Sequence, residues 1–240
     1  ENAMKRTLLS VSLVLLTLVS CSLYQFNPFK RVINYPMPEV KMDNTFFSEM
    51  GCFNSVDCLP GELKNIDAPI TAIYTPSDLL GGLNPQLPLA VASTITFYDD
   101  PEVTSVYRES CMATNNIRYL VVVDDEMRLI DSAEKMKELY APIESEDEAL
   151  AYAMAVTGLS ALYSLDTQLR LKHLTKPLEE SHSTFDGEVF HVHLFDTNIC
   201  GCGPHITESV EVTVHQDGTL EKADPVEAFR DPELDGLCID

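Results

Sequence analysis

The second half of the chain changes from a helical to a strand-like pattern of apolar residues. Residues 145–148 read Ser-Glu-Asp-Glu, a capping box in which Ser145 and Glu148 satisfy backbone N–H groups at a helix start, and apolar residues follow at helical spacing as far as Gly158. Apolar and polar residues then alternate over 169–173, 190–194 and 210–215. With Asp-Gly turn signals at 186–187 and 217–218, the pattern predicts an antiparallel sheet that the helix covers on one face.

The first half predicts a smaller portion of strands and short helices. Strands are expected over 89–98, 117–123 and 127–130, the last two joined by a turn. The Asp-Pro pair at 100–101 predicts the start of a helix that runs to about residue 111, and Asp131 is expected to cap a second helix through residue 140. Residues 52–84 are rich in Pro and Gly and predict loops.

These elements predict the α+β class: an antiparallel β-meander covered on one face by a helix, with an additional small α/β N-terminal portion. The expected organisation has four parts. They are a signal peptide at 1–20, a lipidated cysteine and tether at 21–50, an N-terminal α+β portion at 51–144, and the helix plus antiparallel sheet at 145–240. The last two parts are expected to pack as one domain.

A helix followed by a meander resembles, in element order, the cystatin-like and PepSY-type exported domains. The text VEVTVHQDGTLEKAD at 210–224 resembles their final strand and turn. The resemblance covers about 70 residues without a diagnostic motif, and it implies a helix-on-sheet layer rather than a particular activity.

The N-terminus has the order of segments found in an export signal. A Lys-Arg pair follows Met4, and residues 7–19 form an apolar run shorter than the roughly 20 residues that a membrane-spanning helix needs. Leu18-Val19-Ser20-Cys21 resembles the lipobox of bacterial lipoprotein signal peptides. The resemblance implies cleavage before Cys21 and diacylglycerol on its sulfur. Ser22 implies export to the outer membrane if the organism has one.

Two other interpretations of this segment stay open: an ordinary secretory peptide with a chance cysteine, and an uncleaved anchor helix. Glu1 to Ala3 precede the expected start at Met4 and are interpreted either as non-native additions or as the result of a misplaced start.

Composition narrows the possible partners. The chain has 38 acidic and 16 basic side chains, a formal charge of −22, and removal of residues 1–20 leaves 37 and 14, a charge of −23. Nucleic-acid binding is disfavoured because it needs clustered Lys and Arg, and so is docking to an anionic membrane through a basic patch. With no Trp and 8% aromatic residues, the chain offers no sugar-stacking platform.

Six cysteines remain after Cys21 is assigned to the lipid, and an even number in an oxidising compartment predicts disulfides. Cys52 and Cys58 are expected to close a small loop. A bond within the Cys200-Gly201-Cys202 triplet would be strained, so these two thiols are expected to take different partners, with Cys111 and Cys238 available.

One stretch, HVHLFDTNICGCGPH, combines metal-binding residue types. Its imidazoles and thiols suit zinc or copper, and Gly201 and Gly203 allow a tight loop. The competing interpretation, favoured for the cysteines, is that they are disulfide halves and that the His-x-His pair is solvated. The candidate ligands are His191, His193, Cys200, Cys202 and His205.

The sequence contains no G-x-S-x-G elbow, H-E-x-x-H motif, P-loop or dinucleotide fingerprint. The leading hypothesis is therefore a non-catalytic, lipid-anchored protein of the cell envelope. It would be attached to the membrane through the N-terminal lipid, and an exposed strand edge would bind an envelope partner. The alternatives are a zinc- or copper-binding envelope protein and a hydrolase whose site is assembled from distant residues.

Overall fold

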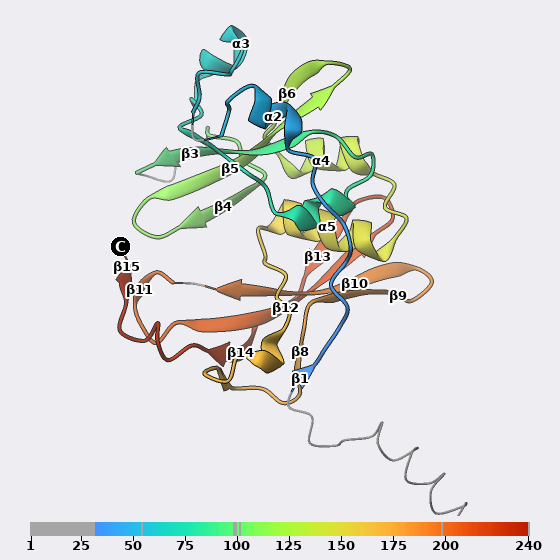
Figure 1. Cartoon of the computed structure of the whole chain (residues 1–240), viewed down its shortest axis with the longest axis vertical. Helices are drawn as coiled ribbons and strands as arrows, with labels where there is room; N and C mark the ends of the chain where they lie inside the picture. Colours follow the sequence, from blue (N-terminus) through green and yellow to red (C-terminus); the bar gives the residue numbers. More distant parts are fainter. Residues whose placement is uncertain (1–31, 54, 98–99, 101, 198, 240) are drawn as a thin grey trace, which may run out of the picture.

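The computed structural model describes residues 32–53, 55–97, 100, 102–197 and 199–239. The signal peptide, the lipobox with Cys21, and Ser22 lie outside the described residues. Two antiparallel sheets lie on opposite sides of a layer of helices (Figure 1). This arrangement of strands and few helices confirms the α+β class. The expected small N-terminal portion is itself an antiparallel sheet, and it covers the other side of the helix.

The first sheet comes from the N-terminal half, and all its pairings are antiparallel. The predicted strands near 89–98, 117–123 and 127–130 are confirmed. Its order is β2 (Ala72–Tyr74), β3 (Leu89–Thr96), β5 (Thr114–Val123) and β4 (Tyr107–Ser110), with β6 (Glu126–Ile130) also paired to β5.

The helix expected over 100–111 is wrong. Asp100 does cap a local turn, because its carboxylate accepts from the N–H of Glu102 (3.0 Å) and its carbonyl from that of Val103 (3.1 Å). The chain then enters β4, where Tyr107 lies opposite Ile117 of β5. Pairing with the open edge of β5 outweighs the local helical spacing of apolar residues.

The second sheet comes from the C-terminal half. The strands expected at 190–194 and 210–215 are confirmed within β10 and β12, which pair antiparallel over nine positions from Val189↔His215 to Thr197↔Thr207. The sheet has the order β7 (Lys172–His173), β14 (Val226–Arg230), β12 (Ile206–His215), β10 (Val189–Thr197) and β9 (His182–Phe185), with β13 (Leu220–Lys222) also paired to β12.

The strand expected over 169–173 is wrong except for its last two residues. A short 3-10 turn, η2 (Leu165–Thr167), is followed by further turns in which Leu169 N–H donates to the Thr167 carbonyl (3.1 Å) and Leu171 N–H to that of Gln168 (3.1 Å). These local bonds use the backbone groups that a strand would direct to a neighbour. Leu169 is consequently 95% exposed.

Helix α5 (Glu146–Thr157) begins and ends where the sequence predicts. Ser145 Oγ accepts from the N–H of Glu148 (3.2 Å), and Gly158 closes the helix in the left-handed conformation at φ 73°. The capping box is shifted by one residue, because the Glu148 carboxylate accepts from the N–H of Glu144 (2.9 Å) rather than that of Ser145. The preceding helix, α4 (Ala133–Tyr140), is capped by Ser132 and not by Asp131.

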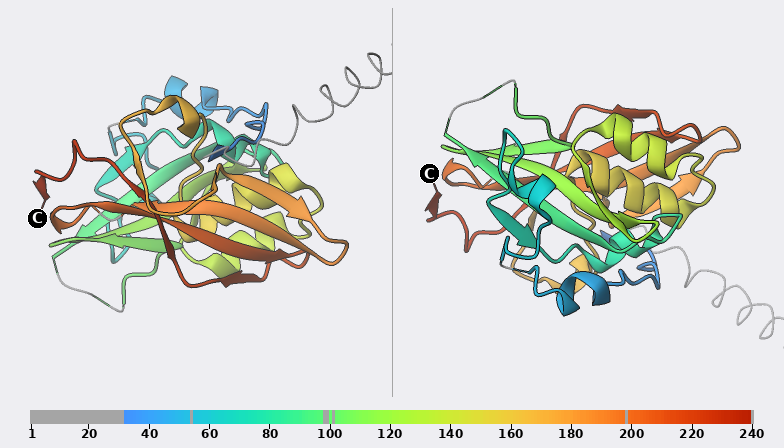
Figure 2. Two further views of the ribbon diagram at one scale, coloured as in Figure 1. Left: turned by 90° about the horizontal axis from the view of Figure 1, so that it is seen from below. Right: turned by 90° about the horizontal axis from the view of Figure 1, so that it is seen from above.

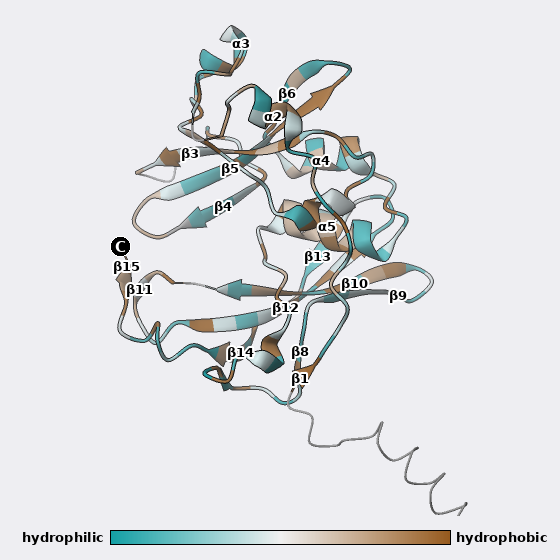
Figure 3. Cartoon of the chain, viewed as in Figure 1, coloured by the Kyte–Doolittle hydropathy of each residue, from teal (hydrophilic) through white to brown (hydrophobic). Residues whose placement is uncertain are grey.

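Helix α5 is buried on both sides, as a helix must be when it is apolar around its circumference. Its alanines at 149, 151, 153 and 155 are fully buried, and most of the helix is coloured as hydrophobic in Figure 3. Tyr119 of β5 donates to the Ala155 carbonyl (2.9 Å), and Tyr152 donates to the Gly218 carbonyl (3.1 Å) beside β13. One hydrophobic core therefore runs through both sheets and joins the predicted portions 51–144 and 145–240.

Smaller elements complete the molecule. Parallel pairing joins β1 (Val32–Ile33) to β8 (Leu178–Glu179), and β11 (Gly201–Cys202) pairs with β15 (Cys238–Ile239). The segment between β1 and β3 contains α2 (Thr45–Glu49), α3 (Gly61–Lys64) and the 3-10 helix η1 (Asp78–Gly82). The views of Figure 2 show that α4 and α5 occupy only one end of the space between the sheets.

Candidate functional site

The six described cysteines form three disulfides, which confirms the prediction of disulfide bonds. Cys52 bonds to Cys58 across the expected small loop. Cys200 and Cys202 take different partners: Cys111, 89 residues away, and Cys238, 36 residues away. In this oxidised state neither Cys200 nor Cys202 offers a thiolate to a metal ion.

The predicted histidine ligands point to separate partners. His191 Nε2 lies 3.1 Å from Asp186, whose pKa is held at about 2, chiefly by the N–H groups of Val189 and Glu188 and then by His191. His193 Nδ1 lies 3.4 Å from the Glu211 carboxylate, and the buried His205 has Nε2 3.2 Å from the Leu237 carbonyl.

The structure therefore does not bring His191, His193, Cys200, Cys202 and His205 into one metal site. Within the described part of the chain, no group of three or more His, Cys, Asp or Glu side chains has an arrangement that could hold a metal ion. The disulfides, which the sequence favoured for both cysteines, remove the two sulfur ligands.

A row of rings that the sequence did not predict lies across β9 and β10, next to Glu211 of β12. The ring of Tyr35 stacks on His182 at 3.7 Å, and that of His182 lies 5.4 Å from His193. The register explains the row, because His182 and Glu211 are the neighbours of His193 on either side. Tyr35 is 147 residues before His182 in the chain, so no local pattern predicts that the two rings meet.

Within this row, the hydrogen bond that His193 donates to Glu211 is the largest cause of the lowered pKa of that carboxyl. We expect His193→Phe to raise the Glu211 pKa toward its ordinary value of 4.5, as followed by NMR titration of the carboxyl carbon. Above that pH the native Glu211 carboxylate stabilises the fold, and this contribution is lost as the pH falls through the lowered pKa. The free energy of unfolding of the variant should therefore decrease less on acidification than that of the native protein.

The matched control for this titration is His191→Phe. His191 lies on the same face of β10 and acts on Glu211 only through its charge, as the smallest of the contributions. An unchanged Glu211 pKa in His193→Phe, or an equal shift in both variants, would contradict the assigned cause.

One hollow is a cleft between the two sheets, at the end of α5, with a volume of about 640 Å³. One wall is β4, with Tyr107, Arg108 and Glu109, and the opposite wall is the end of β10, with Asp196 and Thr197. The Cys111–Cys200 disulfide joins the two walls at one side. We refer to this hollow as the inter-sheet cleft.

Both walls of the inter-sheet cleft are strand edges. β4 pairs with β5 on one side only, and β9 covers β10 only as far as His193. A single bridge, Ser160 to Phe195, lies next to the uncovered end of β10. Edge strands direct alternate N–H and C=O groups away from their sheet, and an extended chain can pair with them.

The lining of the inter-sheet cleft is polar and carries both signs of charge. Lys222 Nζ lies 3.9 Å from the Asp196 carboxylate, and Asn115 Nδ2 donates to Glu109 at 3.4 Å. Burial raises the pKa of Tyr107 from 10.0 to about 12, so its hydroxyl stays protonated and able to donate even in mildly alkaline solution. The described lining contains no histidine, and its two cysteines are joined. It therefore offers hydrogen bonds and charge rather than a nucleophile beside a base.

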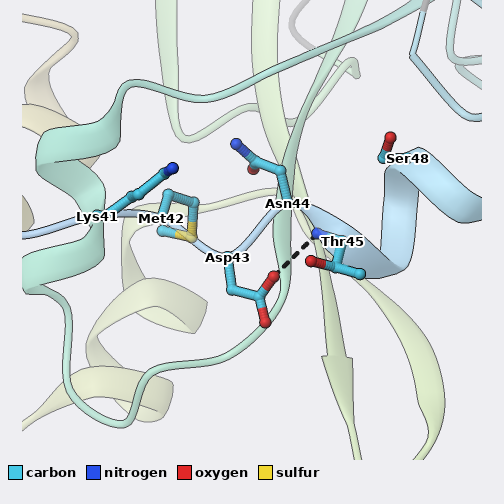
Figure 4. Close-up of a pocket in the computed structure, with 6 residues that line it drawn as sticks. All are labelled: Lys41, Met42, Asp43, Asn44, Thr45 and Ser48. Carbon is cyan, nitrogen blue, oxygen red and sulfur yellow. Dashed lines mark hydrogen bonds between the residues drawn. The ribbon is translucent and has the colours of Figure 1, made fainter.

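A second hollow, of about 510 Å³, lies along residues 41–48. Figure 4 shows that its side chains diverge: Lys41 and Asp43 point in different directions, and the Asp43 carboxylate accepts from the N–H of Thr45 (2.9 Å). Because one continuous segment provides its lining and no charges converge, it is a weaker candidate than the inter-sheet cleft.

Comparison with known proteins gave no match: no protein-family model, no curated protein and no solved structure is similar to this chain. Across the part of the chain that the structure describes, every helix is too short or too polar to cross a bilayer.

Proposed function

We propose that this chain is a lipid-anchored protein of the cell envelope whose folded domain binds an extended segment of a partner protein in the inter-sheet cleft. The observation that carries the binding role is the cleft itself, since strand edges from two sheets face the same hollow. Such edges bind peptides through main-chain hydrogen bonds, while flanking side chains select the sequence.

Two observations support the proposed location in the cell envelope. The lipobox at 18–21 ends in the cysteine that would carry the lipid. The three disulfides suit an oxidising compartment outside the cytoplasm. Acylation of Cys21 with more than one chain would give stable anchoring.

The proposal is tested in bacterial cells that express the full chain with a photo-reactive benzoylphenylalanine at Ile199 and are fed labelled palmitate. Ile199 lines the inter-sheet cleft and is 40% exposed. We expect label on the chain but none on Cys21→Ser, and a discrete cross-linked protein adduct after illumination.

The matched control position is Phe185, which is 41% exposed and lies on β9, the free edge of the second sheet. Adducts from Ile199 and not from Phe185 support the cleft. The same adducts from both positions, or none from Ile199, would exclude it. Palmitate label that persists in Cys21→Ser would exclude the anchor.

A further inference from the structure

The first described residue, Val32, lies beside a loop that exposes apolar and basic side chains. β1 pairs with β8, so Val32 lies next to the end of the loop that spans residues 165–177. The buried carboxylate of Glu180 connects the two: it accepts from Asn34 Nδ2 (2.9 Å), from Tyr35 N–H (3.2 Å) and from Leu165 N–H (2.8 Å). We call residues 165–177 the entry loop, because these contacts fix it to the point where the chain enters the domain.

The entry loop exposes apolar and basic side chains together. Leu169 is 95% exposed, more than any other large hydrophobic side chain among the described residues, and Leu174 is 46% exposed. Lys172 and Lys176 are exposed, and neither forms an ion pair with a described carboxylate. Both lysines line a hollow of about 520 Å³ that also includes Val32 and Leu169.

This local composition is opposite to that of the whole chain. The entry loop has three bases and one acid, Asp166, against 16 bases and 38 acids overall. Arg170 is paired with Asp231 (2.9 Å) and Glu233 (2.8 Å). The basic charge that the entry loop presents to its surroundings is therefore that of the two lysines. The preceding sequence adds Lys30 and Arg31, and residues 21–38 contain no Asp or Glu.

The length of chain before the domain limits how far this surface can be from the lipid. The steps from Cys21 to Val32 span at most about 40 Å when fully extended. Residues 22–31 also include three aromatic side chains, a residue type enriched at membrane–water interfaces.

We propose that the entry loop is the membrane-contacting surface of the anchored domain, with Leu169 inserted among the lipid headgroups and Lys172 and Lys176 against anionic phosphates. The inference rests on the proposed anchor at Cys21. The net charge argues against recruitment of the free chain by an anionic bilayer, but a tethered chain is already at the surface. There the same charge repels the acidic faces and leaves the basic entry loop as the favoured side.

The absence of Trp allows a direct test with a single fluorescent reporter. Leu169→Trp is introduced into the full chain, which is purified in its lipidated form and reconstituted into vesicles of phosphatidylcholine and phosphatidylglycerol with brominated acyl chains. We expect a blue-shifted emission that the bromines quench. Phe97→Trp, at a 76% exposed position outside the entry loop, is expected to show neither effect. Adding Lys172→Gln and Lys176→Gln to Leu169→Trp should reduce the quenching.

The possible outcomes distinguish a wrong membrane-contacting surface from a missing lipid anchor. Unquenched emission from Leu169→Trp in chains that float with the vesicles overturns the contact surface but leaves the anchor intact. If the mass of the chain shows no acyl group on Cys21 and the chain does not float with the vesicles, both the anchor and the contact surface are overturned. A concentration-dependent blue shift of Leu169→Trp in the vesicle-free Cys21→Ser background would assign the surface to a second copy of the chain and overturn the membrane contact.

Discussion

Replacement of both Cys111 and Cys200 by serine is expected to lower the free energy of unfolding by about 4 to 5 kcal/mol, the value that the chain-entropy relation gives for a loop of this length. The bond closes a loop of 89 residues, so its loss lets the unfolded chain reach many more conformations. It also frees the two walls of the inter-sheet cleft from each other. Urea denaturation followed by circular dichroism measures the change.

The matched control is the double replacement of Cys52 and Cys58, whose separation is only six residues. The same relation assigns this pair about 2 kcal/mol, roughly half the loss. Only the Cys111/Cys200 variant should also lose the adduct from Ile199, because only that bond borders the cleft. Equal losses of stability in the two variants would show that loop length does not set the contribution.

Gly158→Ala is expected to destabilise the fold by about 2 to 4 kcal/mol through two separate causes. Gly158 has φ 73°, a left-handed conformation that costs any residue with a Cβ about 1 to 2 kcal/mol. An added Cβ would also overlap the ring of Tyr107, so that ring must shift. Thermal denaturation of the purified domain measures the loss.

Gly51→Ala separates the two causes. Gly51 has nearly the same conformation, φ 67°, but an added Cβ meets nothing within 4 Å. It should therefore cost only the backbone part, about 1 to 2 kcal/mol. If both variants lose the same stability, the contact with Tyr107 is not tight. Because Gly158 and Tyr107 both line the inter-sheet cleft, the same substitution should weaken partner binding.

The elements that the sequence predicts correctly are those whose local and tertiary signals agree. Ser145 and Gly158 bound α5 because side-chain capping and a left-handed glycine act within a few residues. The alternation over 190–194 and 210–215 matches the burial of every second residue in β10 and β12. The pairing of Cys200 and Cys202 with different partners follows from covalent geometry alone.

The failures come from contacts between distant residues. Residues 103–107 have helical spacing, but the chain pairs with the edge of β5 from Val106 onward and enters β4 at Tyr107. Leu169 and Leu171 alternate like a strand, yet local turns use their backbone N–H groups. The inter-sheet cleft could not be predicted, because its walls meet only when α5 has packed between the two sheets.

The Cys111–Cys200 bond also decides what proteolysis can remove. A single cut at any peptide bond between residues 111 and 200, including those of the exposed entry loop, leaves two fragments that the disulfide still joins. A cut between residues 202 and 238 is bridged in the same way. A chain anchored as proposed and nicked in either stretch would keep its C-terminal sheet covalently joined to the membrane until a reductant broke the bond.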